Sequence, residues 1–337
     1  MYSFKNDYSE GAHPKILEML VKCNLEQNEG YGLDVHSKQA EAYMKKHMKR
    51  ENVDIHFIPG GTQTNLLVIS SFLKPYQCVI AADTGHINVH ETGAVEATGH
   101  TVCTVPHVDG KLTKNGIEAV LNANTTEHMV QPGMVYISNT TELGTIYTKA
   151  ELTEISKVCR QHDLLLFLDG ARIASALTSS QNDLKLEDYV DLTDVFYIGG
   201  TKNGALFGEA LVISKDSLKK DFRYMIKNRG AMFAKGFVTG IQFEALFQDT
   251  LYFQLGEHAN QMAGQIGKAL KEKGYSFYAS PCSNQLFPIV TEEYMRKIQK
   301  DFGYNVEKQL ENGKTAIRFV TSWATKQESV DALIQTF

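Results

Sequence analysis

Three polar groups in the sequence follow apolar segments and have the chemical types needed to hold a charged cofactor. The turn 60–62 (Gly-Gly-Thr) separates an apolar run from a helical pattern, Asp169 ends the apolar run LLLFLD, and Lys202 follows YIGGT. Glycines at the start of a helix present backbone N–H groups that suit a phosphate. A buried carboxylate requires a cation, and a desolvated lysine has a lowered pKa that makes its amine nucleophilic.

Each group taken alone also has a structural interpretation. The turn 60–62 could be a tight turn in which Thr62 caps the helix, and it is not a P-loop because the lysine of that motif is missing. Asp169 could form a structural ion pair with Arg172. Lys202 could be a solvated loop residue, since a free lysine with a pKa of about 10.4 is protonated and unreactive.

The three groups together are more specific than any one of them. Pyridoxal phosphate requires a phosphate site, a carboxylate beside its ring nitrogen and a lysine for its aldehyde. Small residues on both sides of Lys202 leave room for the cofactor ring and a substrate. The sequence therefore predicts pyridoxal 5'-phosphate bound by Lys202, Asp169, Gly61 and Thr62.

The segment DTGHINVHETGA (83–94) supplies two histidines and an acid. His86 and His90 are four residues apart and could form a metal pair on a helix, but no third ligand follows at matching spacing, so we assign no metal ligand. We expect the ring of His86 to stack on the cofactor ring instead. His128, which precedes the apolar run MVYISN, is either a second active-site histidine or a surface residue.

Seven apolar runs, which we expect to be strands, position these groups. Helical patterns lie between many of them, as in 149–163, where Leu152, Ile155 and Val158 recur at helical spacing. Continuous apolar strands alternating with helices predict an α/β fold with a mostly parallel sheet covered on both faces. Ligands bind beyond the carboxyl ends of such strands. The strand candidates are 53–58, 78–82, 101–105, 134–139, 164–169, 194–199 and 210–214.

Beyond about residue 216 the pattern changes to long helices, which we expect over 219–236 and 240–274. Two further strand candidates, 284–291 and 315–323, follow them. This change indicates a large α/β domain and a smaller α+β domain, with an N-terminal segment that packs with the smaller one. The expected boundaries are 1–20 for the N-terminal segment, 21–245 for the large domain and 246–337 for the small C-terminal domain.

The composition limits the class of protein. The 337 residues, 43% of them hydrophobic, are sufficient for a substantial core. The formal net charge is −5 and no basic block occurs, so we expect no nucleic-acid partner. No apolar run reaches the roughly 20 residues of a membrane helix. The N-terminus lacks an apolar signal core and the five cysteines are odd in number and scattered, so we expect a cytoplasmic protein with reduced thiols.

The chain resembles the threonine aldolase group of the β-eliminating lyase superfamily, which belongs to fold type I of the pyridoxal phosphate enzymes. The resemblance extends over nearly the whole chain, and its most specific part is LDGARI followed by GGTK. It implies the transferase-like fold of that class, with a large mostly parallel domain and a smaller α+β domain. The motifs are FKNDYSEGAHPKILEML, YGLD, PGGTQTN, HINVHETGA, ISNTTELGTIYT, LDGARI, GGTKNGALFGEALV and IRFVTSW.

The resemblance implies roles for the cofactor-binding residues first. Lys202 matches the lysine that binds the cofactor's aldehyde, and Asp169 matches the partner of the pyridine nitrogen. Gly61 and Thr62 match the phosphate cradle, and His86 matches the ring-stacking histidine.

It also implies residues around the substrate. Arg172, beside the cofactor, and Arg318 match arginines near the substrate carboxylate, for which a bidentate fork is suited. Glu91 matches an active-site glutamate, and His128 has the spacing of a histidine that contacts the substrate hydroxyl. Tyr31 is similar to a tyrosine that reaches a neighbouring subunit's site.

Three positions depart from the family pattern. Asn6 stands where the family commonly has a serine that touches the substrate carboxylate. Gly60 replaces a serine in the phosphate turn, and Thr201 replaces a serine before the lysine. Asn6 is still expected to be a substrate-binding residue.

The resemblance implies a lyase that cleaves the Cα–Cβ bond of a β-hydroxy-α-amino acid, such as L-threonine or L-allo-threonine, to glycine and an aldehyde. The candidate bases for the β-hydroxyl proton are His86, His128 and a water held by Glu91. A homodimer or homotetramer with shared sites is implied as well. The alternatives are another fold type I enzyme (a β-eliminating lyase, an aminotransferase or a racemase) and a non-catalytic oligomeric binding protein.

Overall fold

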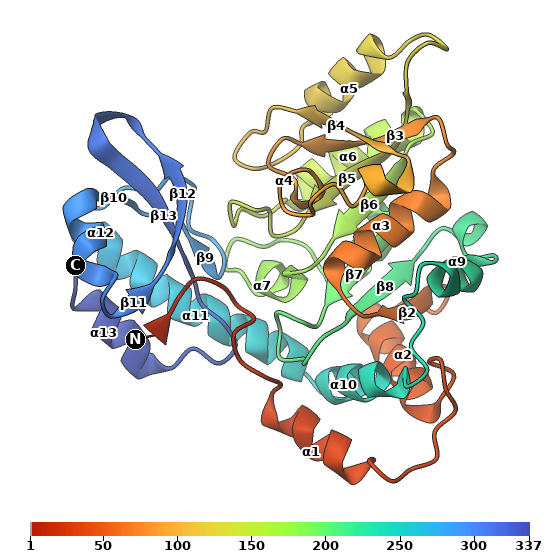
Figure 1. Cartoon of the computed structure of the whole chain (residues 1–337), viewed down its shortest axis with the longest axis horizontal. Coiled ribbons are helices and arrows are strands. Elements are labelled where there is room, and N and C mark those ends of the chain that lie inside the picture. The colour runs from red at the N-terminus through yellow and green to blue at the C-terminus, as the bar shows by residue number, and fades with distance from the viewer. Residues whose placement is uncertain (1) are drawn as a thin grey trace.

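A seven-stranded sheet forms the centre of the chain in the computed structural model, which describes residues 2–337 (Figure 1). Its strands are β2 Asp54–Ile58, β3 Gln77–Ala82, β4 Thr101–Val105, β5 Gln131–Ser138, β6 Leu165–Asp169, β7 Val195–Gly199 and β8 Glu209–Ile213. Their order is β2-β8-β7-β6-β5-β3-β4, and only β8 runs antiparallel to its neighbours. All seven predicted strands and the predicted mostly parallel α/β sheet are confirmed.

Helices cover both faces of this sheet because successive strand residues point to opposite sides. In β6, Leu166 and Leu168 pack into one apolar cluster and Phe167 packs into the other. The helices before residue 248 are α1 Pro14–Lys22, α2 Val35–Met48, α3 Gly61–Phe72, α4 His86–Val89, α5 Lys114–Ala123, α6 Lys149–Gln161, α7 Ile173–Leu177, α8 Leu186–Leu192, α9 Phe222–Asn228 and α10 Phe237–Phe247. The first cluster takes side chains from α2, α5, α6, α8 and α10, and the second takes them from α3 and α9.

The C-terminal part forms a third apolar cluster around a small antiparallel sheet, ordered β10-β13-β12 with β9 also pairing with β13. Its elements are α11 Leu251–Glu272, β9 Gln285–Leu286, β10 Ile289–Thr291, α12 Glu292–Ile298, β11 Phe302–Gly303, β12 Asn305–Gln309, β13 Lys314–Val320 and α13 Gln327–Ile334. Strand β1 (Tyr2–Ser3) pairs with β11, and Phe4 lies in this cluster, whereas α1 packs on α10. The domain boundaries at residues 20 and 245 stay a prediction.

The two long helices predicted after residue 216 are shorter in the structure. The segment 240–274 is divided into α10 and α11, and Nε2 of His47 on α2 lies 3.2 Å from the carbonyl oxygen of Phe247 and 3.1 Å from that of Asp249. The segment 219–236 contains only α9 as a regular α-helix. No helix within residues 2–337 is both long and apolar enough to cross a membrane.

Candidate active site

A cleft of about 550 Å³ opens where the carboxyl ends of β5, β6 and β7 meet residues from β13. This is the edge at which ligands bind to parallel sheets. Lys202 and Asp169, from strand ends far apart in the sequence, both line it. The predicted site residues that line this cleft are Gly61, Thr62, His86, Asp169, Arg172, Lys202 and Arg318.

The turn before α3 leaves backbone N–H groups open at the cleft. Gly60 is the N-cap residue and no side chain caps the helix, so the alternative in which Thr62 is the cap is wrong. The amide of Thr64 bonds to the carbonyl of Gly60 at 3.0 Å, which leaves the earlier amides of the first turn without intrahelical partners. This helix start, together with the hydroxyl of Thr62, fits a phosphate.

Asp169 is held as an anion at the end of β6, where it is only 4% exposed. The hydroxyl of Tyr136 donates to its Oδ2 at 2.6 Å, and the amide of Ala171 donates to its Oδ1 at 2.9 Å. Burial alone would raise the pKa of Asp169, but the charge of His86 and these hydrogen bonds hold the pKa below its usual value. A buried ionised carboxylate of this kind fits a protonated ring nitrogen.

Lys202 lies in the same cleft, with its Nζ 6.0 Å from the centroid of the Tyr8 ring. Burial, followed by the positive charge of Arg172, lowers the pKa of Lys202 below the ordinary value. The negative charges of Asp7 and Asp169 act in the opposite direction. The net result is an amine that loses its proton more readily, as a lysine that reacts with an aldehyde requires.

His86 lies in the single-turn helix α4 and faces the cleft, while Glu91 lies behind it. Nδ1 of His86 is 2.8 Å from Oε1 of Glu91, and the amide of Asn65 donates to the same oxygen at 2.7 Å. Burial alone would lower the pKa of His86, but Glu91 and then Asp169 raise it above the usual value. Glu91 is buried and does not line the cleft, so it acts on His86 rather than directly on a bound molecule.

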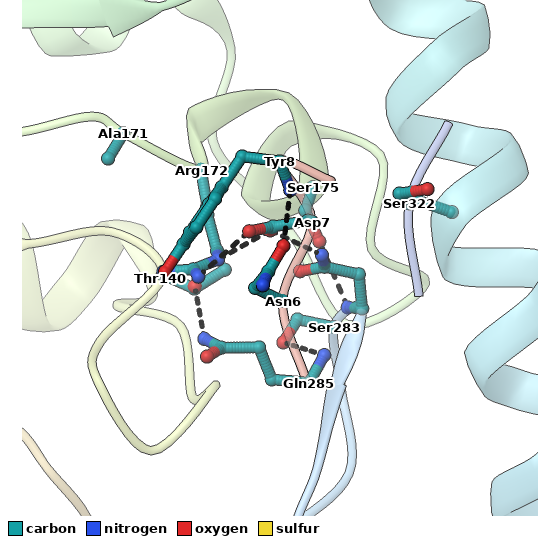
Figure 2. A network of polar contacts seen from close by, with 12 residues as sticks. Asn6, Asp7, Tyr8, Thr140, Ala171, Arg172, Ser175, Ser283, Gln285 and Ser322 are labelled. Carbon is teal, nitrogen blue, oxygen red and sulfur yellow. Dashed lines mark hydrogen bonds and ion pairs between the residues drawn. The ribbon is translucent and has the colours of Figure 1, made fainter. Parts of the chain in front are cut away.

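Arg172 and Arg318 differ in whether their guanidinium groups already have hydrogen-bond partners within the protein. Arg172 donates from Nε and Nη2 to the two carboxylate oxygens of Asp7, at 2.7 and 3.0 Å (Figure 2). The alternative in which Arg172 pairs with Asp169 is therefore wrong. Arg318, in contrast, has a buried Nε with no hydrogen-bond partner among residues 2–337. An unpaired buried donor beside the cleft fits an anionic ligand group such as a carboxylate.

Asn6 does not line the cleft, although its neighbour Tyr8 does. Its Oδ1 accepts a hydrogen bond from the backbone amide of Tyr8 at 3.0 Å (Figure 2). It also accepts one from the hydroxyl of Ser9 at 2.9 Å. The structure thus gives Asn6 a turn contact that positions Tyr8. Its predicted role in substrate binding stays a prediction.

Two other predicted residues lie outside this cleft. Tyr31 is 45% exposed, and Nζ of Lys227 is 4.8 Å from its ring centroid. His128 is exposed in the loop before β5, whereas Ser138 at the other end of that strand lines the cleft. At about 3.3 Å per residue, the strand separates the two by roughly 25 Å. His128 therefore does not line the cleft of its own chain, and its contact with the substrate hydroxyl stays a prediction.

Two acids that line the cleft, the half-buried Glu142 and the buried Glu209, were missed from the sequence. Glu142 accepts a hydrogen bond from the hydroxyl of Ser138 at 3.1 Å, and burial raises its pKa. Glu209 begins β8 and is 4% exposed. Glu142 lies in ISNTTELGTIYT and Glu209 in GGTKNGALFGEALV, but the resemblance assigns neither of them a role. The sequence feature that could have indicated Glu209 is its place as the first residue of the apolar run EALVI, shortly after Lys202.

Comparison with known proteins identifies the family. The sequence profile described as beta-eliminating lyase matches residues 8–293. The chain belongs to this family. A low specificity L-threonine aldolase from Pseudomonas aeruginosa is 28% identical over 336 residues, covering 98% of this chain and 95% of that protein. A threonine aldolase structure from Leishmania major is 50% identical, with a TM-score of 0.98 and coverage of 99% of this chain and 98% of that one.

This member of the beta-eliminating lyase family shares its fold more widely. An aspartate aminotransferase from Thermus thermophilus has a TM-score of 0.74 at 13% identity, over 100% of this chain and 91% of that one, which shows a common fold. The fold is that of fold type I pyridoxal phosphate enzymes, and the protein is a pyridoxal-phosphate-dependent lyase. Its open helix start, ionised acid and deprotonation-prone lysine fit that cofactor.

Proposed function

We propose that this protein is an aldolase that cleaves the Cα–Cβ bond of L-threonine or L-allo-threonine to give glycine and acetaldehyde. One observation carries the proposal. A single cleft combines the amine of Lys202, the ionised Asp169, the open start of α3 and the unpaired guanidinium of Arg318. The relatives that match this chain nearly from end to end, which are threonine aldolases, support it.

In this proposal the chain supplies binding, orientation and proton transfer. When bound, pyridoxal phosphate supplies an electron sink for the electron pair released at the substrate's Cα. Gly61 and Thr62 would hold the phosphate, Lys202 would hold the aldehyde group, and Asp169 would favour a proton on the ring nitrogen. His86 would lie beside the ring.

The substrate side of the proposal rests on a carboxylate site and a base. Arg318 binds the substrate carboxylate, and this contact fixes which bond at Cα is aligned for cleavage. Nδ1 of His86 is occupied by Glu91, so Nε2 is the nitrogen that takes the β-hydroxyl proton. Arg172, whose guanidinium is bound by Asp7, lines the cleft and adds positive charge near Arg318.

The test is to incubate the purified protein with L-threonine or L-allo-threonine and to measure glycine and trapped acetaldehyde. Glycine and acetaldehyde in equal amounts are expected. The same reactions are assayed for pyruvate, a keto acid and the D-enantiomer, which separates an eliminating lyase, an aminotransferase and a racemase. Release of those products without glycine would contradict the proposal, as would wild-type turnover in Lys202→Ala.

We also propose a cytoplasmic homodimer or homotetramer in which Tyr31 contributes to a partner's cleft. Tyr31 is 45% exposed outside its own cleft, and apolar side chains around it are exposed as well. Light scattering of the purified protein tests the assembly, and a monomer with full activity would refute it. The exposed apolar residues in this region are Leu17, Val21, Leu25, Leu33 and Val35.

A further inference from the structure

We propose that Glu209 is a positioning residue that controls the proton on the amine of Lys202. This inference rests on the proposed function, because it assigns a task within the same cleft. Glu209 lies in the motif GGTKNGALFGEALV, but the resemblance assigns it no role and no role described above uses it.

The backbone around Glu209 is fixed from both sides. As the first residue of β8, it is paired with Ile58 of β2 and with Gly199 of β7 in the antiparallel ladders. Its side chain is 4% exposed and lines the cleft together with Lys202. The carboxyl group therefore reaches the lysine's surroundings from the sheet rather than from a loop.

Both oxygens of Glu209 bind the two residues that precede Lys202. Oε1 accepts from the hydroxyl of Thr201 at 2.8 Å, and Oε2 accepts from the amide of Gly200 at 3.0 Å. The Thr201 hydroxyl in turn accepts from the amide of Gly208 at 3.0 Å. These bonds attach the acid to the segment that carries the lysine, so the distance between the two groups is constrained.

The charges in the cleft make the two groups interdependent. Burial raises the pKa of Glu209 to about 8, and the charge of Lys202 opposes that rise. Each charge of such a pair stabilises the other, so the protons belong to the pair rather than to either residue. When Glu209 holds a proton, the amine is free to bind a carbonyl carbon. When Glu209 is ionised, it favours the charged form of the lysine nitrogen.

Other charged groups act on the pair, but from different elements. Arg172, before α7, lowers the pKa of Lys202, while Asp7 of the N-terminal segment and Asp169 of β6 raise it. Asp169 also raises the pKa of Glu209. Tyr197 and Tyr252 are the remaining titratable groups near Glu209, and both have pKa values raised mainly by burial, so they stay neutral. Glu209 alone among the acids acting on Lys202 is bonded to the lysine's own segment.

The experiment titrates the visible absorbance of the protein with bound pyridoxal phosphate over pH. The midpoint reports the proton on the lysine nitrogen joined to the cofactor. Glu209→Gln keeps the size of the side chain and removes its negative charge, so the midpoint is expected to fall by about 1 pH unit. Glu209→Asp keeps the charge and is expected to lie between wild type and Glu209→Gln.

Glu142→Gln is the matched control, because Glu142 is another acid of the cleft but is not among the charges with the largest effect on the pKa of Lys202. Its midpoint is expected to stay at the wild-type value. A folded Glu209→Gln protein with the wild-type midpoint would overturn the inference, as would an equal shift in Glu142→Gln.

A second variant covers the case in which Glu209→Gln does not fold. Thr201→Val keeps the side-chain shape and removes the hydroxyl that donates to Glu209, which makes the ionised acid less favourable. The midpoint is again expected to fall, and an unchanged midpoint would overturn the inference. If wild type binds pyridoxal phosphate and titrates, but the variants have the wild-type midpoint, the inference about Glu209 is overturned while the proposed function stands. A wild-type protein that takes up no pyridoxal phosphate overturns both.

Discussion

At the scale of single residues, His86 and Glu91 form a pair whose effect on pH dependence can be measured. The reaction requires an unprotonated Nε2, so kcat/KM is expected to rise as pH increases through the His86 pKa. Glu91 holds this pKa above its usual value. Glu91→Gln removes the negative charge, and the rising limb should move about 1 pH unit toward lower pH.

The measurement for this pair is the pH profile of kcat/KM with L-threonine as substrate. Glu96→Gln is a suitable control because Glu96 is an exposed acid of the neighbouring 3-10 helix. Its profile should match the wild type. A Glu91→Gln profile with an unmoved acidic limb would show that His86 is not the group that titrates.

Arg318 leads to a prediction about substrate affinity. Its unpaired Nε is the best placed donor for a carboxylate, and a hydrogen bond to a charged group contributes about 1.5–3 kcal/mol. Arg318→Gln should therefore raise KM for L-threonine roughly ten- to a hundredfold. Arg296→Gln, at an exposed pair with Glu292, serves as the control. An Arg318→Gln enzyme with an unchanged KM would remove Arg318 from substrate binding.

At the scale of elements, two glycines on α11 test how closely this helix packs. A Cβ on Gly256 would lie 2.8 Å from backbone atoms of Ala174 in α7, whereas a Cβ on Gly264 would meet nothing within 4 Å. Gly256→Ala should destabilise the protein by about 1–3 kcal/mol through overpacking. Gly264→Ala should stabilise it by up to about 1 kcal/mol because alanine favours the helix.

The unfolding free energies of both variants are measured by urea denaturation. The test is whether the unfolding free energy falls in Gly256→Ala and rises in Gly264→Ala. The two substitutions are chemically identical and lie on one helix, so a difference in sign must come from the surroundings of each glycine. If both variants were equally destabilised, close contact between α7 and α11 would not be the cause.

The sequence predicted strands better than helix ends, for a physical reason. Strands such as β6 and β7 are buried on both faces, and burial makes their sequences continuously apolar. The end of α10 has no glycine or proline signal. It is marked instead by His47, whose ring nitrogen reaches carbonyl oxygens at the helix end. Such a contact comes from a distant part of the chain and leaves no local pattern.

The same reason explains which site residues were predicted. Lys202, Asp169 and the turn before α3 stand directly after strands, so the sheet topology places them at one edge. Glu209 reaches that edge because β8 runs antiparallel, and an antiparallel strand presents its first residue where parallel strands present their last. His128 lies outside the cleft of its own chain because the whole length of β5 separates it from Asn139 at the cleft end of that strand.

At the scale of the whole molecule, Asp7 connects three distant parts of the chain. It accepts two hydrogen bonds from the guanidinium of Arg172, which precedes α7 (Figure 2). It also accepts one of 2.9 Å from the side-chain amide of Asn284, which precedes β9. Its side chain is 1% exposed and that of Arg172 is 14% exposed. The ion pair therefore holds the N-terminal segment, the large sheet and the C-terminal part at the rim of the cleft.

Asp7→Asn should consequently be among the most destabilising single substitutions, because it leaves Arg172 as a buried cation without its anion. The expected loss is about 3–5 kcal/mol of unfolding free energy. Asp191→Asn breaks a comparable pair with Arg50 at an exposed position, and there the loss should stay below about 1 kcal/mol. Equal losses in the two variants would contradict the structural role of the buried pair.

The pH dependence of the unfolding free energy gives a second, independent test of the ion pair between Asp7 and Arg172. Burial alone would raise the pKa of Asp7, but the charges of Arg172 and Lys202 hold it below its usual value. A group with a lowered folded pKa contributes stability above its unfolded pKa of about 3.9 and loses it as pH falls toward the folded value. Wild type should therefore lose this contribution below about pH 4, whereas Asp7→Asn, which cannot titrate there, should show a shallower acid dependence. Parallel curves for the two proteins, measured by urea denaturation at a series of pH values, would mean that Asp7 does not carry a buried charge in the folded protein.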